Sequence, residues 1–214
     1  MGYFITFEGI EGCGKSTQIV RLAASLRQQG YTVRTTREPG GCPLADAMRR
    51  ILLDPKSSEL VPRAELLLYA AARAQHVAEV IRPALTADEI VLCDRYIDAT
   101  VAYQGMGRGL DLALIHELNR LASDGVTPDL TLLLDMPVET GLDRARQRNG
   151  ADNDAEGRFE AESFAFHQRI RDGYLQLAAD EVRFCRIEAQ GTIDEVEQRI
   201  TAAVEDFLQA GQTP

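Results

Sequence analysis

The chain has 214 residues, the usual size of one domain, and 45% of them are hydrophobic. No run of about 18 apolar residues could span a membrane, and residues 1–5 enter a strand-like segment without the features of a signal peptide. The net charge of −10 argues against a nucleic-acid-coating protein, and the scattered cysteines and histidines suggest no transition-metal site. We therefore expect one cytoplasmic domain over residues 1–214.

Strands and helices alternate along the first part of the chain. Residues 3–7 form a short β-rich run, and a helical pattern with one apolar face begins near Ser16. Residues 32–36 predict a second strand. Two helical patterns follow at about 44–53 and 63–86, and the second is rich in alanine.

Two later apolar runs each end in a carboxylate. Residues 90–93 precede Asp94 and residues 130–134 precede Asp135, as expected for buried parallel strands. The remaining elements are expected as helices at about 138–148, 159–180 and 192–208, with a weak strand at 184–187. This alternation predicts an α/β fold with a parallel sheet of about five strands, helices on both faces, and ligands at the carboxyl ends of the strands.

Residues 149–157 hold almost no apolar side chain and separate two helical stretches that carry arginine. This composition predicts a mobile flap. With its flanks it forms a predicted lid at about 144–160. Closure of such a lid over a phosphate donor excludes water from the transfer reaction.

A phosphate-binding motif lies between the first strand and the first helix. Residues 9–16, Gly-Ile-Glu-Gly-Cys-Gly-Lys-Ser, match G-x-x-x-x-G-K-[ST] in full. Backbone N–H groups of such a loop point at phosphate oxygens, while Lys15 adds a charge and Ser16 a hydroxyl ligand for Mg²⁺. The residues expected to bind ATP are Gly9, Ile10, Glu11, Gly12, Cys13, Gly14, Lys15, Ser16, Thr17 and Arg144.

A P-loop alone does not separate a switch GTPase, a motor ATPase and a kinase. The guanine-reading Asn-Lys-x-Asp of GTPases is absent from the sequence, and the one Asp-x-x-Gly, at 154–157, lies in the polar flap. Motor ATPases usually have larger or repeated cores. A small chain with an arginine-flanked flap fits a kinase best.

Several further segments carry a family resemblance. They are Arg-Glu-Pro-Gly-Gly at 37–41, Asp-Arg-Tyr at 94–96 and Ala-Tyr-Gln-Gly-Met-Gly-Arg-Gly at 102–109. Together with the P-loop, and with a segment at 69–76 that looks like a base-binding helix, they resemble the thymidylate kinases over nearly the whole chain. The resemblance implies that the γ-phosphoryl group of ATP passes to dTMP with Mg²⁺, giving dTDP for dTTP synthesis. It also implies a homodimer, for which the alanine-rich helix at 63–86 is a weak hint.

The resemblance implies a pocket for the thymidine part of dTMP. Tyr69 and Arg73 lie four residues apart and so share a helix face, which would place a ring under the thymine and a guanidinium at a thymine carbonyl. Thr100 and Gln104 supply polar groups suited to the thymine edge. Tyr103 would pack under the deoxyribose and leave no room for a 2′-hydroxyl.

The charged groups near the phosphates follow predicted strand ends or lie in the P-loop. Arg37 and Arg95 are expected at the acceptor phosphate, because a planar guanidinium suits bidentate phosphate recognition. Asp94 would hold Mg²⁺ through water, and Asp135 is its rival for that role. Glu11 is expected from the family to reach the sugar 3′-hydroxyl or its bound water.

The transfer reaction also needs a cation for the charge that develops on the transferred group. The P-loop provides only Lys15. Relatives of one subtype carry an arginine where Gly12 or Cys13 stands here, so this chain resembles the other subtype, which delivers arginine from the lid. Arg158 is the first candidate for that catalytic role and Arg148 the second.

Two alternatives remain open at this point. One is another nucleoside monophosphate kinase, acting on AMP, GMP or CMP with the same chemistry and a different base pocket. The other is a P-loop switch or assembly ATPase that uses hydrolysis to change partners.

Overall fold

The computed structural model describes residues 2–152, 158–159 and 162–210, with backbone only for 148–152. Its centre is one sheet of five parallel strands in the order β2-β3-β1-β4-β5, so the predicted parallel α/β sheet is confirmed. The strands are β1 (Phe4–Glu8), β2 (Val33–Arg37), β3 (Ile90–Asp94), β4 (Leu130–Asp135) and β5 (Phe184–Glu188). Every residue of β1 and β4 is buried, which explains their continuous apolar runs.

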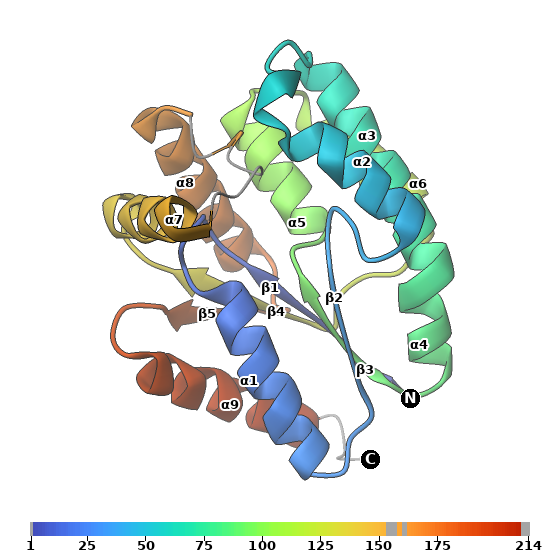
Figure 1. The fold of residues 1–214 in the computed structure, drawn as a ribbon. Helices are drawn as coiled ribbons and strands as arrows, with labels where there is room; N and C mark the ends of the chain where they lie inside the picture. Colours follow the sequence, from blue (N-terminus) through green and yellow to red (C-terminus); the bar gives the residue numbers. More distant parts are fainter. Residues whose placement is uncertain (1, 153–157, 160–161, 211–214) are drawn as a thin grey trace.

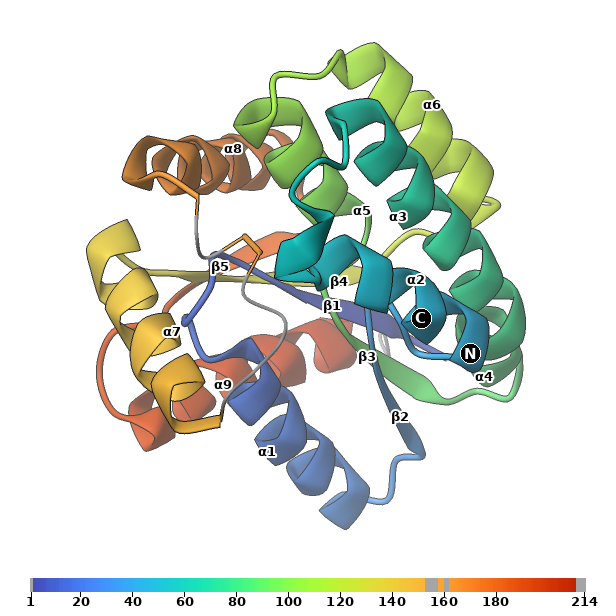
Figure 2. The same cartoon turned by 45° about the horizontal axis from the view of Figure 1, so that its top comes forward.

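Helices cover both faces of the sheet (Figures 1 and 2). One face carries α1 (Lys15–Gln28) and α9 (Ile193–Ala210), which pack against each other. The remaining helices include α2 (Pro43–Leu53), α3 (Pro62–His76), α4 (Arg82–Thr86), α5 (Ile97–Thr100), α6 (Leu112–Ser123), α7 (Val138–Asp152) and α8 (Phe164–Asp180). Within the described ranges, no helix combines the length and apolar character needed to cross a membrane.

Two helix boundaries differ from the prediction. Helix α7 continues to Asp152, so residues 149–152 are helical. Helix α8 begins at Phe164 and not near 159, because Ser163 caps it by accepting a hydrogen bond from the Phe166 N–H. The rest of the predicted flap, 153–157, lies outside the described residues.

The segment between β3 and β4 contains helices that the sequence analysis did not predict. A π-helical stretch, Val101–Gly107, continues α5, and α6 follows after Asp111, whose side chain caps it. The predicted helix at 63–86 is continuous, with a π-helical turn at Val77–Ile81 joining α3 to α4. Of these helices, α3, α5 and the π-helical stretch after α5 line a pocket that also contains Asp94, the last residue of β3.

Candidate active site

The P-loop joins the central strand β1 to α1. Its bends require glycine, because Gly9, Gly12 and Gly14 all have φ in the left-handed region, at 136°, 72° and 93°. At position 12 a Cβ atom would also collide with the carbonyl oxygen of Gly141 in α7. The loop therefore has no room for a side chain at that position.

The Lys15 ammonium lies over this loop. Its Nζ donates hydrogen bonds to the carbonyl oxygens of Gly9, at 3.1 Å, and Ile10, at 3.0 Å, and the side chain is buried. Carbonyl oxygens orient an ammonium without neutralising it. Its charge is therefore available to phosphate oxygens in the loop.

Two candidate Mg²⁺ ligands meet beside the P-loop. Phe7 of β1 is in register with Asp94 of β3, which brings that carboxylate next to α1, and Ser16 Oγ donates to Asp94 Oδ2 at 2.7 Å. A hydroxyl and a carboxylate suit Mg²⁺, which completes its coordination with water and substrate phosphates. Among the described residues no group of three or more His, Cys, Asp or Glu side chains forms a metal cage.

Asp135, the rival carboxylate, lies in different surroundings. Arg171 Nε lies 2.7 Å from Oδ1 and Arg186 lies 2.6 Å from Oδ2. Burial alone would raise the pKa of Asp135, but the hydrogen bonds from these two arginines outweigh it and lower that pKa. Since Asp135 is already occupied by two guanidinium groups, the geometry favours Asp94 as the metal carboxylate.

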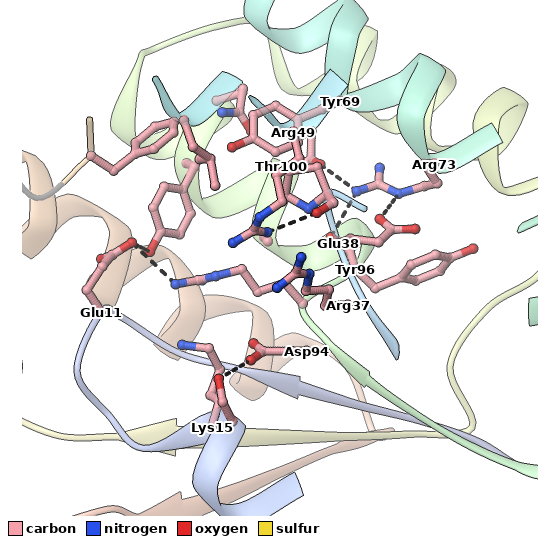
Figure 3. A pocket seen from close by; sticks show the side chains of 18 of the residues that line it. Glu11, Lys15, Arg37, Glu38, Arg49, Tyr69, Arg73, Asp94, Tyr96 and Thr100 are labelled. Carbon is pink, nitrogen blue, oxygen red and sulfur yellow. Dashed lines mark hydrogen bonds and ion pairs between the residues drawn. The ribbon is translucent and has the colours of Figure 1, made fainter. Parts of the chain in front are cut away.

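A pocket of about 220 Å³ opens next to Ser16 and Asp94. Figure 3 shows Tyr69, Arg73 and Thr100 toward one end, Lys15 and Asp94 toward the other, and Arg37 between them. The predicted residues that line it are Glu11, Gly12, Lys15, Ser16, Arg37, Tyr69, Arg73, Asp94, Arg95, Thr100, Tyr103 and Gln104. The tertiary structure thus gathers the predicted base, sugar and phosphate residues around one cavity.

Glu11 stands at the side of this pocket. Tyr103 Oη donates to its Oε1 at 2.5 Å, Arg95 lies 3.3 Å from the same oxygen, and His167 Nδ1 lies 3.4 Å from Oε2. Burial alone would raise the pKa of Glu11, but the His167 contact and the Arg95 charge outweigh it and hold that pKa well below its usual value. Glu11 is therefore a carboxylate that can accept a hydrogen bond from a ligand hydroxyl or water.

Arg73 is held mainly by the protein. It is 2% exposed and makes four hydrogen bonds, to Glu38, Asn119, the Tyr96 carbonyl and Thr100 Oγ1. A guanidinium has five N–H groups, so one remains for a ligand. The Thr100 hydroxyl accepts from Arg73 at 2.9 Å and keeps its own hydrogen for another acceptor.

Comparison with known proteins agrees with this geometry. The model of the family described as "Thymidylate kinase" matches residues 7–200. The chain belongs to the thymidylate kinase family. It is 61% identical to a thymidylate kinase of Geotalea uraniireducens over 206 residues, covering 95% of this chain and 97% of the relative. It is 63% identical to that of Trichlorobacter lovleyi, covering 94% and 96%.

A solved structure supports the same assignment. The crystal structure of thymidylate kinase from Ehrlichia chaffeensis superposes with a TM-score of 0.77 at 34% identity, and the match covers 95% of this chain and 98% of that one. The resemblance to the thymidylate kinases and the P-loop kinase fold are therefore confirmed.

Of the expected lid arginines whose side chains the structure describes, neither Arg158 nor Arg144 lines the pocket. Arg158 Nη1 lies 2.7 Å from Glu65 of α3 and donates to the Leu52 carbonyl at 3.1 Å. Arg144 is exposed on α7. The side chain of Arg148 lies outside the described residues. In this structure, then, the Arg158 guanidinium is held by Glu65, which lies behind the pocket residue Gln104.

Sequence reasoning missed two features of the site. Arg49 of α2 lines the pocket and donates to the Pro39 carbonyl at 2.9 Å, and its place on a helix directly after the Arg37 loop was the available signal.

Glu8, buried at the end of β1, accepts from the Tyr96 N–H and from Tyr174 Oη. Burial, reinforced by the nearby charge of Asp98, raises the pKa of Glu8 to about 8. No sequence signal marked Glu8, because its partners are distant along the chain.

Proposed function

We propose that this chain transfers the γ-phosphoryl group of ATP to dTMP in the cytoplasm, giving dTDP and ADP for dTTP synthesis. The observation that carries the proposal is the single pocket that joins the P-loop to a nucleoside-sized cavity lined by Tyr69, Arg73 and Thr100. Membership of the thymidylate kinase family supports dTMP as the acceptor of the phosphoryl group.

Each group of pocket residues has a separate role in the proposed transfer. Lys15 and the P-loop N–H groups hold the β- and γ-phosphates of ATP, and Ser16 and Asp94 would hold Mg²⁺, directly and through water. Magnesium, when bound, neutralises charge on the phosphates. Arg37 and Arg95 orient the acceptor phosphate for attack on the γ-phosphorus, and Arg49 is placed to assist them.

A panel of acceptors tests the proposal. With ATP and Mg²⁺, a coupled assay of ADP release is expected to show rapid turnover with dTMP and at least roughly 10²-fold lower kcat/KM with AMP, GMP and CMP. A purine preference would instead establish another nucleoside monophosphate kinase. ATP turnover of equal rate without any acceptor would establish a switch ATPase.

We also propose that the chain acts as a homodimer. Helix α3 exposes Leu67, at 51%, and the alanines 71 and 74 follow along the same face, which Ala78 continues in the π-helical turn. The neighbouring α6 exposes Leu114, at 40%, and Leu121, at 70%. Two exposed apolar stripes on adjacent helices are typical of a surface that another chain covers, and small residues allow close helix approach. A second copy of this chain is the proposed occupant.

Introducing a charge into this surface tests the dimer. Leu121→Glu is expected to convert the protein from twice the mass of one chain to a monomer in sedimentation equilibrium, because a carboxylate cannot be buried unpaired without a large penalty. The matched control is Val20→Glu. Val20 is 69% exposed on α1, which lies away from the proposed dimer surface on α3 and α6 (Figure 1). A monomeric parent, or a Leu121→Glu protein that stays dimeric, would contradict the proposal.

A further inference from the structure

The amide of Gln104 is held from behind the pocket. Gln104 lines the pocket from the π-helical stretch after α5, yet its side chain is buried and its Nε2 donates to Glu65 Oε1 at 2.8 Å. Glu65 stands in the first turn of α3, is fully buried, and does not line the pocket. A buried carboxylate thus lies directly behind a pocket amide.

Two guanidinium groups accompany that carboxylate. Arg158 lies 2.7 Å from Glu65 Oε2, and Arg108 reaches both oxygens at 3.4 Å. A carboxylate accepts hydrogen bonds and donates none, so it can face only the NH₂ side of the Gln104 amide. The opposite orientation would place two oxygen acceptors against each other with no proton between them. The amide therefore has one orientation, with Nε2 on Glu65 and Oε1 left for a ligand.

The orientation of this amide has a chemical consequence for the base. A thymine or uracil ring presents an N3–H donor, whereas a cytosine ring presents an N3 acceptor at the same position. Arg73 and Thr100 line the same pocket as Gln104, and each keeps one hydrogen that a base can accept: one N–H of Arg73 and the hydroxyl hydrogen of Thr100. This set of groups matches the O4 and N3–H of thymine.

We propose that Glu65 is a specificity-determining positioning residue, which selects thymine and uracil over cytosine by fixing the orientation of the Gln104 amide. The inference rests on the proposed function, because it assumes that a pyrimidine nucleotide occupies the pocket. Glu65 touches no substrate in this account. It acts through Gln104, and its effect is on the choice between bases.

Glu65→Gln is expected to reverse the orientation of the Gln104 amide, with almost no change in the shape of the side chain at position 65. The oxygen of the introduced amide stays with Arg158, its NH₂ group turns toward Gln104, and Gln104 must then offer Oε1 to that group and its own NH₂ to the base. The kcat/KM ratio of dTMP to dCMP is expected to fall by roughly 10²-fold, since a site built to bond an N–H rejects a mismatched group strongly. The ratio of dTMP to dUMP should stay within about twofold, because both bases present the same N3–H.

Two controls separate this effect from a structural one. Arg108→Met removes a neighbour of Glu65 but leaves Glu65 and Gln104 in place, so its dTMP to dCMP ratio should equal that of the parent. In a Gln104→Met background, Glu65→Gln should no longer change the ratio. If Glu65→Gln shows no thermal transition, the double variant with Arg108→Met, which removes one uncompensated charge, is measured in its place.

The outcomes distinguish the inference from the proposed function. A parent protein that does not phosphorylate dTMP would overturn the proposed function. A parent active on dTMP whose Glu65→Gln variant keeps the dTMP to dCMP ratio would overturn the inference alone. So would an effect of Glu65→Gln that persists without Gln104.

Discussion

Replacement of Lys15 by methionine is expected to lower kcat by about 10³-fold or more while the protein still folds. Methionine keeps the apolar stem, which packs in the buried loop, and removes only the ammonium. The loss in the folded state is limited to the hydrogen bonds that the ammonium makes within the loop, chiefly with the Gly9 and Ile10 carbonyls. The charge acts on β- and γ-phosphate oxygens, so its removal should mainly lower the rate of phosphoryl transfer.

The measurement is kcat at saturating ATP and dTMP, together with the thermal unfolding midpoint. The chain's other lysine, Lys56, is exposed in the short segment after α2, so Lys56→Met is the matched control. It should keep parental kcat. A Lys15→Met enzyme whose kcat stays within a few-fold of the parental kcat would refute the assignment of residues 9–16 as the ATP-binding P-loop.

Removal of a lid arginine is expected to lower kcat by roughly 10²–10⁴-fold with little change in dTMP binding. The P-loop has no room for a side chain at Gly12 and carries a cysteine at position 13, so an arginine for the charge that develops on the transferred group must come from elsewhere. Helix α7 packs against the loop at Gly141 and leads into the lid. We propose Arg158 first and Arg148 second as the source of that charge.

The structure describes the surroundings of the first of these two arginines. Arg158 is ion-paired with the buried Glu65, so Arg158→Ala should lower both kcat and the thermal unfolding midpoint, because a buried carboxylate loses a partner. For Arg148→Ala we expect a lower kcat. Arg199 of α9, which donates to backbone carbonyls far from the pocket, gives the control variant Arg199→Ala. Near-parental kcat in both lid variants would place the catalytic cation outside the lid.

The sequence by itself determined the features that depend on local order. Alternating apolar runs and helical periodicity predicted the parallel sheet, because each buried strand and each amphipathic helix is encoded within a few neighbouring residues. The P-loop was predicted for the same reason: its glycines, Lys15 and Ser16 are contiguous, and strand and helix flank them. Helix ends were less certain, since the end of α7 and the start of α8 depend on caps and propensities of single residues.

Only the tertiary structure decided how equivalent side chains are used. Asp94 and Asp135 both end apolar strands, and what separates them is that Ser16 meets the first while Arg171 and Arg186 occupy the second. Arg158, 93 residues from Glu65 along the chain, pairs with it behind the residues that line the pocket. Such partners come from segments that folding brings together, and no local pattern records them. The choice between two carboxylates, and the orientation of the Gln104 amide, therefore follow from packing and not from spacing.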